Sequence, residues 1–434
     1  MMAKTTFVAT GDIFITRRLG KDAYEGFEEV AEIIRAHDVC FTNLEMTFHD
    51  AESYPAAESG GTWAMTEPGA LDDIKRYGFN LFNTANNHAG DYGPGGIMAT
   101  IRHLRERDMV FAGTGANLAE ASRPGYLEAR HARVALIAAC GTLHPAEVAG
   151  IQGPSLPGRP GMNPIRCVRQ YHVDPDTYQT LEGIAADLGI HSSQTVEVRM
   201  GYSNPPPEGT FLFGGLRIIK GTERKQRTVP HSGDMNRIVA EIQEAKRQAD
   251  VVLVSFHSHT ARMPGPSNVS AEYLETFARA CIDAGADAVL GHGPHELRGI
   301  EIYREKPIFY SLGNFLFETE TVSVQPTEAF LNKGMPADTK VGAYMDNRSK
   351  DGTIGYGTVP EIWKSVMASF TMEEGKLTGV TLYPVELGMG NRRTQLGLPR
   401  IESGNETLAY LASLSEPYGT HIRVENGIGR IDFA

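Results

Sequence analysis

Residues 251–259 have the sequence VVLVSFHSH, an apolar run that leads directly into two histidines, His257 and His259. A short and wholly apolar run of this kind predicts a strand that is buried on both faces, as in a parallel sheet. Four other apolar runs also end in polar clusters: Phe7–Thr10 before Gly11-Asp12, Val39–Thr42 before Asn43-Leu44-Glu45, Phe79–Thr84 before Ala85-Asn86-Asn87-His88, and Ala286–Leu290 before Gly291-His292-Gly293-Pro294-His295. Because parallel strands place their carboxyl ends along one edge of a sheet, where ligands bind, we expect these five clusters to converge on one site.

The order of strands and helices around a long interruption predicts an α/β fold. Apolar runs alternate with segments of helical spacing in residues 1–140 and again in residues 234–320, which we assign to one layered core. Residues 141–233 contain many prolines and are interpreted as an insertion that borders the site. Residues 321–434 are interpreted as a C-terminal extension that completes the core, although residues 319–360 are polar, rich in glycine and without periodicity.

Composition narrows the class of protein. The 434 residues are 41% hydrophobic, enough for a large core, and the formal net charge is −12. That charge argues against a nucleic-acid partner, but it is compatible with an anionic small-molecule or oligomeric substrate, because bound metals and a few arginines can reverse the local field. No apolar stretch approaches the roughly 18–20 residues of a membrane span, so a cytoplasmic protein without a signal peptide is expected.

Carboxylate and amide side chains follow the first three predicted strands. Asp12 could bind or bridge metal ions, or it could cap a helix or a turn. Glu45, taken alone, is typical of a solvated surface position. Asn87 offers an amide oxygen as a ligand, and Asp91 is placed to hydrogen-bond His88 and fix its tautomer, with an Asx-type turn as the alternative.

Four histidines follow the last two predicted strands. His257 closes the apolar run, and His259 faces the same side if the strand continues. His292 and His295 flank a Gly-Pro pair, so one short turn would present two imidazoles. Oxygen and imidazole ligands together suit two divalent ions, with manganese, zinc and iron as candidates. A purely structural metal site is the alternative, but such sites are typically closed and rich in cysteine.

Two further polar residues are candidates for the site. Arg17 follows the first strand and could hold a carboxylate or phosphate in a bidentate contact, or it could be a solvated residue at a helix start. Asn314 follows another apolar strand and could orient a site histidine or cap a turn.

These residues resemble the CapA (poly-γ-glutamate capsule synthesis) family of the calcineurin-like metallophosphoesterase superfamily. The matching motifs are Gly11-Asp12 with Arg17, Asn43-Leu44-Glu45, Ala85-Asn86-Asn87-His88, Gly291-His292 with Pro294-His295, and the run from Lys306 to Phe315. The resemblance covers about residues 5–318 and implies a layered metallophosphatase-like sheet sandwich flanked by helices, with a long insertion. It also implies that His88 contacts the substrate and that the metal ligands are Asp12, Glu45, Asn87, His257, His292 and His295.

The sequence departs from the family pattern in three places. In one of them, Ser258-His259 stands where CapA-like chains usually have Trp-Gly. The Asp-x-His pair that usually opens a metallophosphoesterase is absent, because Phe14 stands two residues after Asp12. Gly293 stands where a histidine is often found between the residues that match His292 and Pro294. His259 is the candidate additional ligand that would compensate.

The residues and the resemblance together predict a metal-dependent hydrolase that acts through a metal-activated water. The substrate is either a phosphoester or a carboxylate-rich, γ-glutamyl-like amide, and the sequence favours neither. His88, oriented by Asp91, is the candidate general acid, and Arg17 is the candidate anion contact. The alternative is a non-catalytic protein that takes part in capsule or poly-γ-glutamate synthesis.

Overall fold

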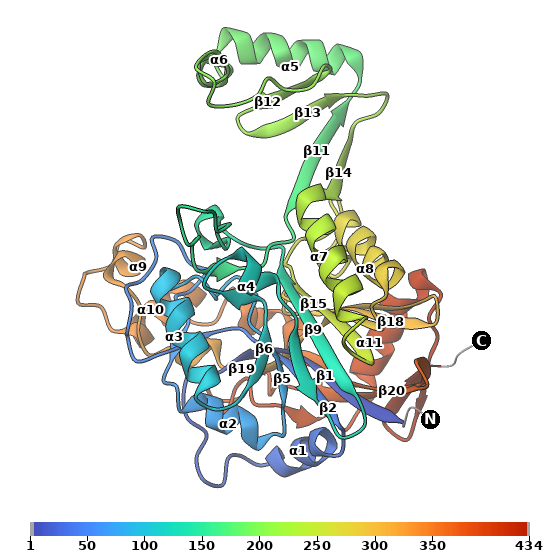
Figure 1. Ribbon diagram of the computed structural model, residues 1–434. Helices are drawn as coiled ribbons and strands as arrows, with labels where there is room; N and C mark the ends of the chain where they lie inside the picture. Colours follow the sequence, from blue (N-terminus) through green and yellow to red (C-terminus); the bar gives the residue numbers. More distant parts are fainter. Residues whose placement is uncertain (1–3, 432–434) are drawn as a thin grey trace.

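The computed structural model describes residues 4–431 and shows two β-sheets packed face to face between helices (Figure 1). The sheets enclose a core that includes Phe7 and Phe41 from one sheet and Leu253 and Phe309 from the other. A second core lies between the first sheet and helices α1 (Phe27–Arg35) and α2 (Ala70–Arg76), and a third lies between the second sheet and helices α7 (Ser232–Ala245) and α8 (Glu272–Ala284). The predicted layered α/β sandwich flanked by helices is therefore confirmed.

The first sheet is mixed and has the N-terminal strand near its middle. Strand β1 is parallel to β2 on one side and antiparallel to β20 on the other, and β19 also pairs with it in parallel. The order is β23-β24-β21-β20-β1-β2-β5-β6. Its strands are β1 Thr5–Phe14, β2 Val39–Leu44, β5 Leu81–Asn83, β6 Val110–Ala112, β19 Asn314–Phe317, β20 Lys364–Glu373, β21 Lys376–Glu386, β22 Arg400–Ile401, β23 Ile422–Glu425 and β24 Ile428–Ile431.

The second sheet has four parallel central strands, and β15, the run that ends at His257, lies in its middle. The order is β17-β18-β16-β15-β9-β8. All seven residues of β15 are buried, as expected for a strand covered on both faces. Its strands are β8 Gly125–Glu128, β9 Arg133–Cys140, β15 Val251–His257, β16 Ala288–His292, β17 Leu297–Tyr303 and β18 Lys306–Leu312.

The chain passes from the second sheet to the first at a single glycine. Strand β18 ends at Leu312 and β19 begins at Asn314, so Gly313 joins strands of different sheets. Its φ of +72° favours glycine. Gly11 of β1 faces this junction, where a Cβ would lie 1.8 Å from the Gly313 carbonyl oxygen, so the two sheets approach closely at the end of β1.

The helices cover the outer faces of the sandwich and its edges. Phe27, Val30 and Ile34 form the buried side of α1, while Ile238 and Ile242 are buried on α7. The helices of the sandwich are α1 Phe27–Arg35, α2 Ala70–Arg76, α3 Gly93–Arg105, α4 Leu118–Ser122, α7 Ser232–Ala245, α8 Glu272–Ala284 and α11 Glu406–Ser415; two short pairs, β3 Thr47–Phe48 with β4 Met65–Thr66 and β7 Thr114–Gly115 with β10 Gly161–Met162, lie outside the large sheets. None of the helices within residues 4–431 combines the length and apolar composition that a bilayer crossing needs.

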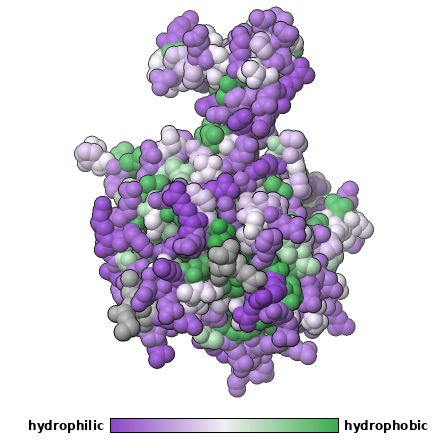
Figure 2. Space-filling model, turned by 90° about the vertical axis from the view of Figure 1, so that its right-hand side faces the viewer, coloured by the Kyte–Doolittle hydropathy of each residue, from purple (hydrophilic) through white to green (hydrophobic). Residues whose placement is uncertain are grey.

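Most of the predicted insertion forms a lobe that stands on two strands. Strands β11 and β14 leave the sandwich side by side and lead to the lobe, whose exposed face in Figure 2 is mainly hydrophilic. Val173, Tyr178, Ala185, Phe211 and Ile218 give it a small core of its own. Its elements are β11 Cys167–Val173, α5 Pro175–Asp187, α6 Ser192–Arg199, β12 Thr210–Phe213, β13 Leu216–Lys220 and β14 Lys225–Pro230. The division into core, insertion and extension stays a prediction.

The segment expected to lack periodic structure contains two helices. Helices α9 (Thr327–Leu331) and α10 (Val341–Ser349) lie within residues 319–360. Phe330 and Tyr344 pack together, and Trp63 from the N-terminal half joins their cluster. The hydrophobic pattern is too sparse for a helix prediction because α10 buries only two of its side chains.

Candidate metal centre

Asp12 lies at the junction between the two sheets, where β1 is irregular. The register of β1 with both β2 and β19 shifts beside Asp12, and the backbone N–H of Asp12 donates to the Gly313 carbonyl at 3.0 Å. The sequence pattern placed Gly11-Asp12 just after the apolar run Phe7–Thr10, but β1 continues through both residues to Phe14. The bulge turns the Asp12 carboxylate toward the second sheet, whose strand ends carry the histidines.

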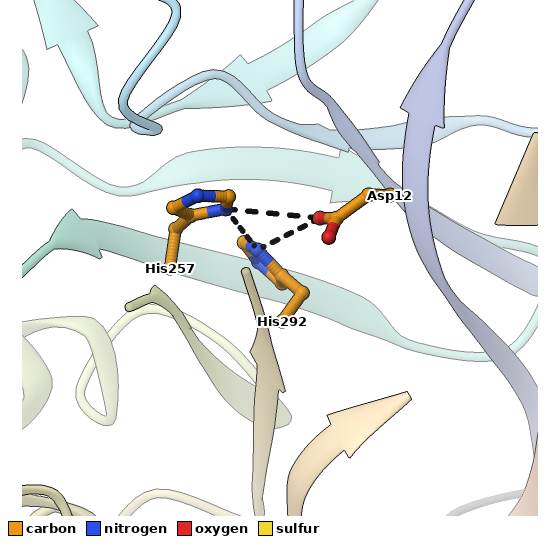
Figure 3. Close-up of side chains that lie close together, drawn as sticks. All are labelled: Asp12, His257 and His292. Carbon is orange, nitrogen blue, oxygen red and sulfur yellow. Dashed lines mark hydrogen bonds and ion pairs between the residues drawn. The ribbon is translucent and has the colours of Figure 1, made fainter. Parts of the chain in front are cut away.

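The first group of ligand atoms comprises Asp12, His257 and His292, which point toward one another from both sheets (Figure 3). The Asp12 carboxylate lies 3.7 Å from Nδ1 of His257 and 3.4 Å from Nδ1 of His292. The two imidazole nitrogens are 3.0 Å apart. His257 and His292 are register partners on the parallel strands β15 and β16, so the sheet itself places these rings side by side.

The second group of ligand atoms comprises Glu45, His259 and His295. Glu45 Oε2 lies 3.8 Å from Nδ1 of His295, and Glu45 Oε1 lies 3.5 Å from Nε2 of His257. His259 Nε2 is 3.3 Å from the same His257 nitrogen. His257 therefore lies between the two groups, and within each group the ligand atoms are within 4.8 Å of one another.

Three buried oxygens at this position have no hydrogen-bond partner. Both carboxylate oxygens of Glu45 and the amide oxygen of Asn87 are in this state, while the side chains are 0% and 2% exposed. Unpaired buried acceptors are costly in a folded protein, and a carboxylate is costlier than an amide. Divalent cations would satisfy them, so the donor set fits the predicted metal ions.

Burial keeps the site histidines neutral, which is the state that binds metal. Burial lowers the pKa of His292 to about 3 and that of His295 to about 4, and it holds the pKa of His257 well below its usual value. The opposite holds for Glu45, where burial and the nearby carboxylates of Asp12 and Asp91 raise the pKa well above its usual value. A cation between these groups would favour the ionised form of Glu45.

His88 and Asp91 form the predicted pair at the edge of the cluster. Nδ1 of His88 lies 2.7 Å from Oδ2 of Asp91. Asp91 also accepts hydrogen bonds from the backbone N–H groups of Gly60 and Ala64, at 2.9 and 2.7 Å. Because a carboxylate only accepts, His88 donates through Nδ1, which leaves Nε2 for another contact.

Asn314 and Asn43 hold the cluster from outside. Oδ1 of Asn314 is 2.9 Å from Nδ1 of His295, and its Nδ2 donates to the His295 carbonyl, so Asn314 orients a site histidine. Nδ2 of Asn43 donates to Asp12 at 2.7 Å.

The sequence did not assign Asn43, although its position two residues before Glu45 places both side chains on the same face of a strand. Ser255, which contacts His292 Nε2 at 2.7 Å, could have been found by the same spacing before His257.

The departure from the family pattern at Gly293 has a structural explanation. A Cβ on Gly293, whose φ is +120°, would lie 2.7 Å from the Ser258 backbone nitrogen and 3.2 Å from His257 Nε2. No side chain fits there, and His259 brings an imidazole into the cluster instead. Phe14 supplies no ligand; its ring lies 5.3 Å from that of His88.

A cavity of about 220 Å³ opens beside the cluster and is lined by both His88 and His295. Its other lining residues are Phe14, Gly60, Gly61, Thr62, Phe317, Thr319, Arg348 and Tyr356. Arg17 is not among them, because its guanidinium pairs with the buried Glu318 at 2.7 Å and with the Thr394 carbonyl. The arginine that the structure places at the cavity is Arg348, on a helix that the sequence pattern did not predict.

Comparisons with known proteins agree with the motifs. The family model described as "Bacterial capsule synthesis protein PGA_cap" matches residues 6–319. "Uncharacterized protein y4sH" of Sinorhizobium fredii is 33% identical over 98% of this chain and 92% of its own length. "Capsule biosynthesis protein CapA" of Bacillus anthracis is 26% identical over 73% of this chain and 60% of its own length. A hypothetical protein from Thermus thermophilus aligns in structure with a TM-score of 0.42 and 12% identity, over 88% of this chain and 99% of that one.

The family match spans every ligand of both groups, from Asp12 to His295. The Sinorhizobium fredii relative extends the similarity beyond residue 319, because its alignment covers 98% of the chain. The chain therefore belongs to the bacterial capsule synthesis protein family PGA_cap.

Proposed function

We propose that this protein is a metal-dependent hydrolase of anionic substrates, which cleaves a phosphoester or a γ-glutamyl-like amide. The observation that supports it best is the pair of ligand groups, Asp12-His257-His292 and Glu45-His259-His295, with the unpaired carboxylate of Glu45 buried among them. Asn87 is proposed as a further ligand through its unpaired amide oxygen. Two divalent ions held there would supply an activated water and positive charge for the attacked group.

The residues around the ions have separate proposed roles. Asp12 and Glu45 would neutralise the cations, and Asn314 and Asn43 would hold His295 and Asp12 in place. His88, fixed by Asp91, would act in its imidazolium form, which gives its Nε2 proton to the leaving group and becomes neutral. Because His88 and His295 both line the cavity, a substrate held there would contact one proposed metal ligand and the proposed proton donor.

A second function is favoured by the relatives' names. The Bacillus anthracis protein is named for capsule biosynthesis rather than for a hydrolytic reaction. A non-catalytic role in the synthesis or handling of a capsule or a poly-γ-glutamate polymer would use the same fold without turnover. Such a role does not explain why a carboxyl group with no hydrogen-bond partner is buried next to three histidines, His257, His259 and His295.

Metal analysis and a substrate screen distinguish the two functions. Purified protein is supplemented with manganese, zinc or iron, dialysed and assayed by plasma mass spectrometry. It is then tested on aryl phosphates and on γ-glutamyl anilides. Bound metal with turnover of either substrate class supports the hydrolase, and the productive class identifies the bond. Metal content close to zero after all three supplements would contradict the proposal.

Replacing His259 by Ala should lower the metal content from two ions per chain to one, because only the second ligand group includes His259. The first group, centred on Asp12, keeps all its ligands. Plasma mass spectrometry measures the change, and the exposed His421→Ala provides the matched control. An unchanged content of two ions in His259→Ala would show that His259 is not a ligand.

Removing the lobe should separate recognition from catalysis. Residues 171–226 can be replaced by an Asn-Gly turn, because Gln170 and Arg227 are register partners on β11 and β14. The small core of the lobe lies wholly within the deleted range. We expect unchanged metal content and unchanged hydrolysis of small aryl substrates, but an altered preference for oligomeric substrates. Loss of metal on deletion would instead make the insertion part of the core.

A further inference from the structure

The cavity beside the ligand groups has one cationic side chain, Arg348. It lies on α10, beyond the end of the family match at residue 319, so the family model does not assign it. A guanidinium has five N–H donors. Within residues 4–431, the Arg348 side chain donates a hydrogen bond from Nη1 to Thr62 Oγ1 at 2.7 Å. No carboxylate of the described chain forms an ion pair with it, in a protein whose formal net charge is −12.

The position of Arg348 is fixed by packing rather than by a charge partner. Tyr344 and Met345, earlier on α10, are buried in the cluster that Trp63 joins. Trp63 is held in turn, because its backbone N–H and carbonyl both hydrogen-bond the side chain of Gln325. Helix α10 is therefore anchored on the segment that carries Thr62, and this anchoring directs Arg348 to the cavity.

Tyr356 completes the wall between Arg348 and the ligand groups. Its ring lies 5.5 Å from that of His295 and 5.4 Å from that of Phe317. Burial raises the pKa of Tyr356, with added effects from the carboxylates of Glu45 and Asp12, while Arg348 opposes them. The Tyr356 side chain is therefore within electrostatic reach of the metal ligands and of the arginine together.

From the unpaired guanidinium at this cavity we infer that Arg348 binds an oxyanion of the substrate, either a phosphate or a carboxylate, and so selects the substrates that this site accepts. The inference deepens the proposed function and rests on it in taking the cavity as the substrate site. The volume of about 220 Å³ sets the size of the bound group. At roughly 30 Å³ per water molecule this space holds about seven waters, which is enough for one small anionic group.

Arg348 has a closely matched control in Arg393. The Arg393 guanidinium pairs with Asp346, which is also on α10, but Arg393 does not line the cavity. A Gln substitution at either position removes one positive charge, from α10 itself at Arg348 and from a residue that pairs with α10 at Arg393. A general loosening of α10 would affect both variants, whereas a direct anion contact would affect only Arg348→Gln.

The experiment is calorimetric titration of inorganic phosphate and of glutarate into wild type, Arg348→Gln, Arg348→Lys and Arg393→Gln. Each protein is used as purified and after addition of manganese. We expect wild type to bind at least one of the anions, and Arg348→Gln to bind it about tenfold or more weakly, because charge-assisted hydrogen bonds are lost. Arg348→Lys should recover part of the affinity, and Arg393→Gln should match wild type. The preferred anion identifies the substrate as a phosphate or a carboxylate compound.

Three results would overturn the inference: no binding of either anion by wild type, equal binding by Arg348→Gln, or an equal loss in Arg393→Gln. The outcome is independent of turnover. Arg348-dependent binding without any hydrolysis supports this inference and contradicts the hydrolase, whereas hydrolysis with no Arg348 effect contradicts this inference alone.

Discussion

Replacing Glu45 by Gln should stabilise the metal-free protein and destabilise the metal-loaded one. Glu45 is 0% exposed and neither carboxylate oxygen has a hydrogen-bond partner, so its charge opposes folding when no cation is present. Burial and the charges of Asp12 and Asp91 raise its pKa well above the usual 4.5. A raised pKa in the folded state means that stability is lost as pH rises above about 4.5 toward that higher value, so the advantage of the Gln variant should grow with pH.

With metal present the sign reverses, because a charged ligand is lost. A loss of affinity on the order of 100-fold is expected for a change in the ligand set, and each tenfold loss removes about 1.4 kcal/mol of binding free energy. Thermal unfolding with EDTA and with manganese, together with metal analysis, measures both effects.

Glu147→Gln is the matched control for Glu45→Gln. Glu147 is also a buried glutamate with one unpaired oxygen, and burial raises its pKa to about 7, but it belongs to neither ligand group. The Glu147→Gln variant should be more stable than wild type in EDTA, and it should bind as much metal as wild type when manganese is added. A Glu45→Gln variant that retains two ions, or that is less stable than wild type in EDTA, would remove Glu45 from the centre.

Replacing His88 by Ala should reduce kcat by about 10²–10⁴-fold, the usual contribution of a general acid or base, while metal content is unchanged. His88 lines the cavity but belongs to neither ligand group. Both quantities are measured on the same samples. Steady-state kinetics on the substrate class that wild type hydrolyses gives kcat, and metal analysis gives the number of ions per chain.

His103→Ala is the control for His88→Ala. His103 lies on helix α3, away from the cavity, and its ring contacts the carboxylates of Glu52 and Glu106. This variant should keep wild-type activity. Asp91→Asn should lie between the two, since it leaves His88 in place without the carboxylate that fixes its tautomer. If His88→Ala keeps more than half of the wild-type kcat, its proposed role as the proton donor is wrong.

The strand-end clusters could be predicted because the signal is local. An apolar run followed by a polar residue predicts both the strand and the sheet edge where it ends, and this placed His257 and His292 correctly beside Asp12. The spacing of His259 to His257 likewise placed its imidazole in the cluster, where it lies in the second ligand group. The family prediction was confirmed for the same reason, since its motifs coincide with these strand ends.

The cavity wall could not be predicted because its residues are brought together by long-range packing. Arg348 reaches Thr62 across 286 positions of the chain, on a helix with too few apolar residues to be recognised. Arg17 follows β1 closely in sequence, yet Glu318 takes its guanidinium because β19 pairs with β1 and brings the following residues alongside. The hydrophobic pattern of a segment predicts that it forms a strand, but which strand it pairs with depends on the topology of the whole sheet.

The position of β1 between β2 and β20 has a consequence for biosynthesis. The N-terminal strand leaves the ribosome first, but its antiparallel partner, Lys364–Glu373, is made only near the end of translation. His295 is also a late product, so a nascent chain carries Asp12 and Glu45 for most of its synthesis without the histidines that complete the centre. Any ion held by both ligand groups would therefore enter only after residues of both sheets have been made and have packed together.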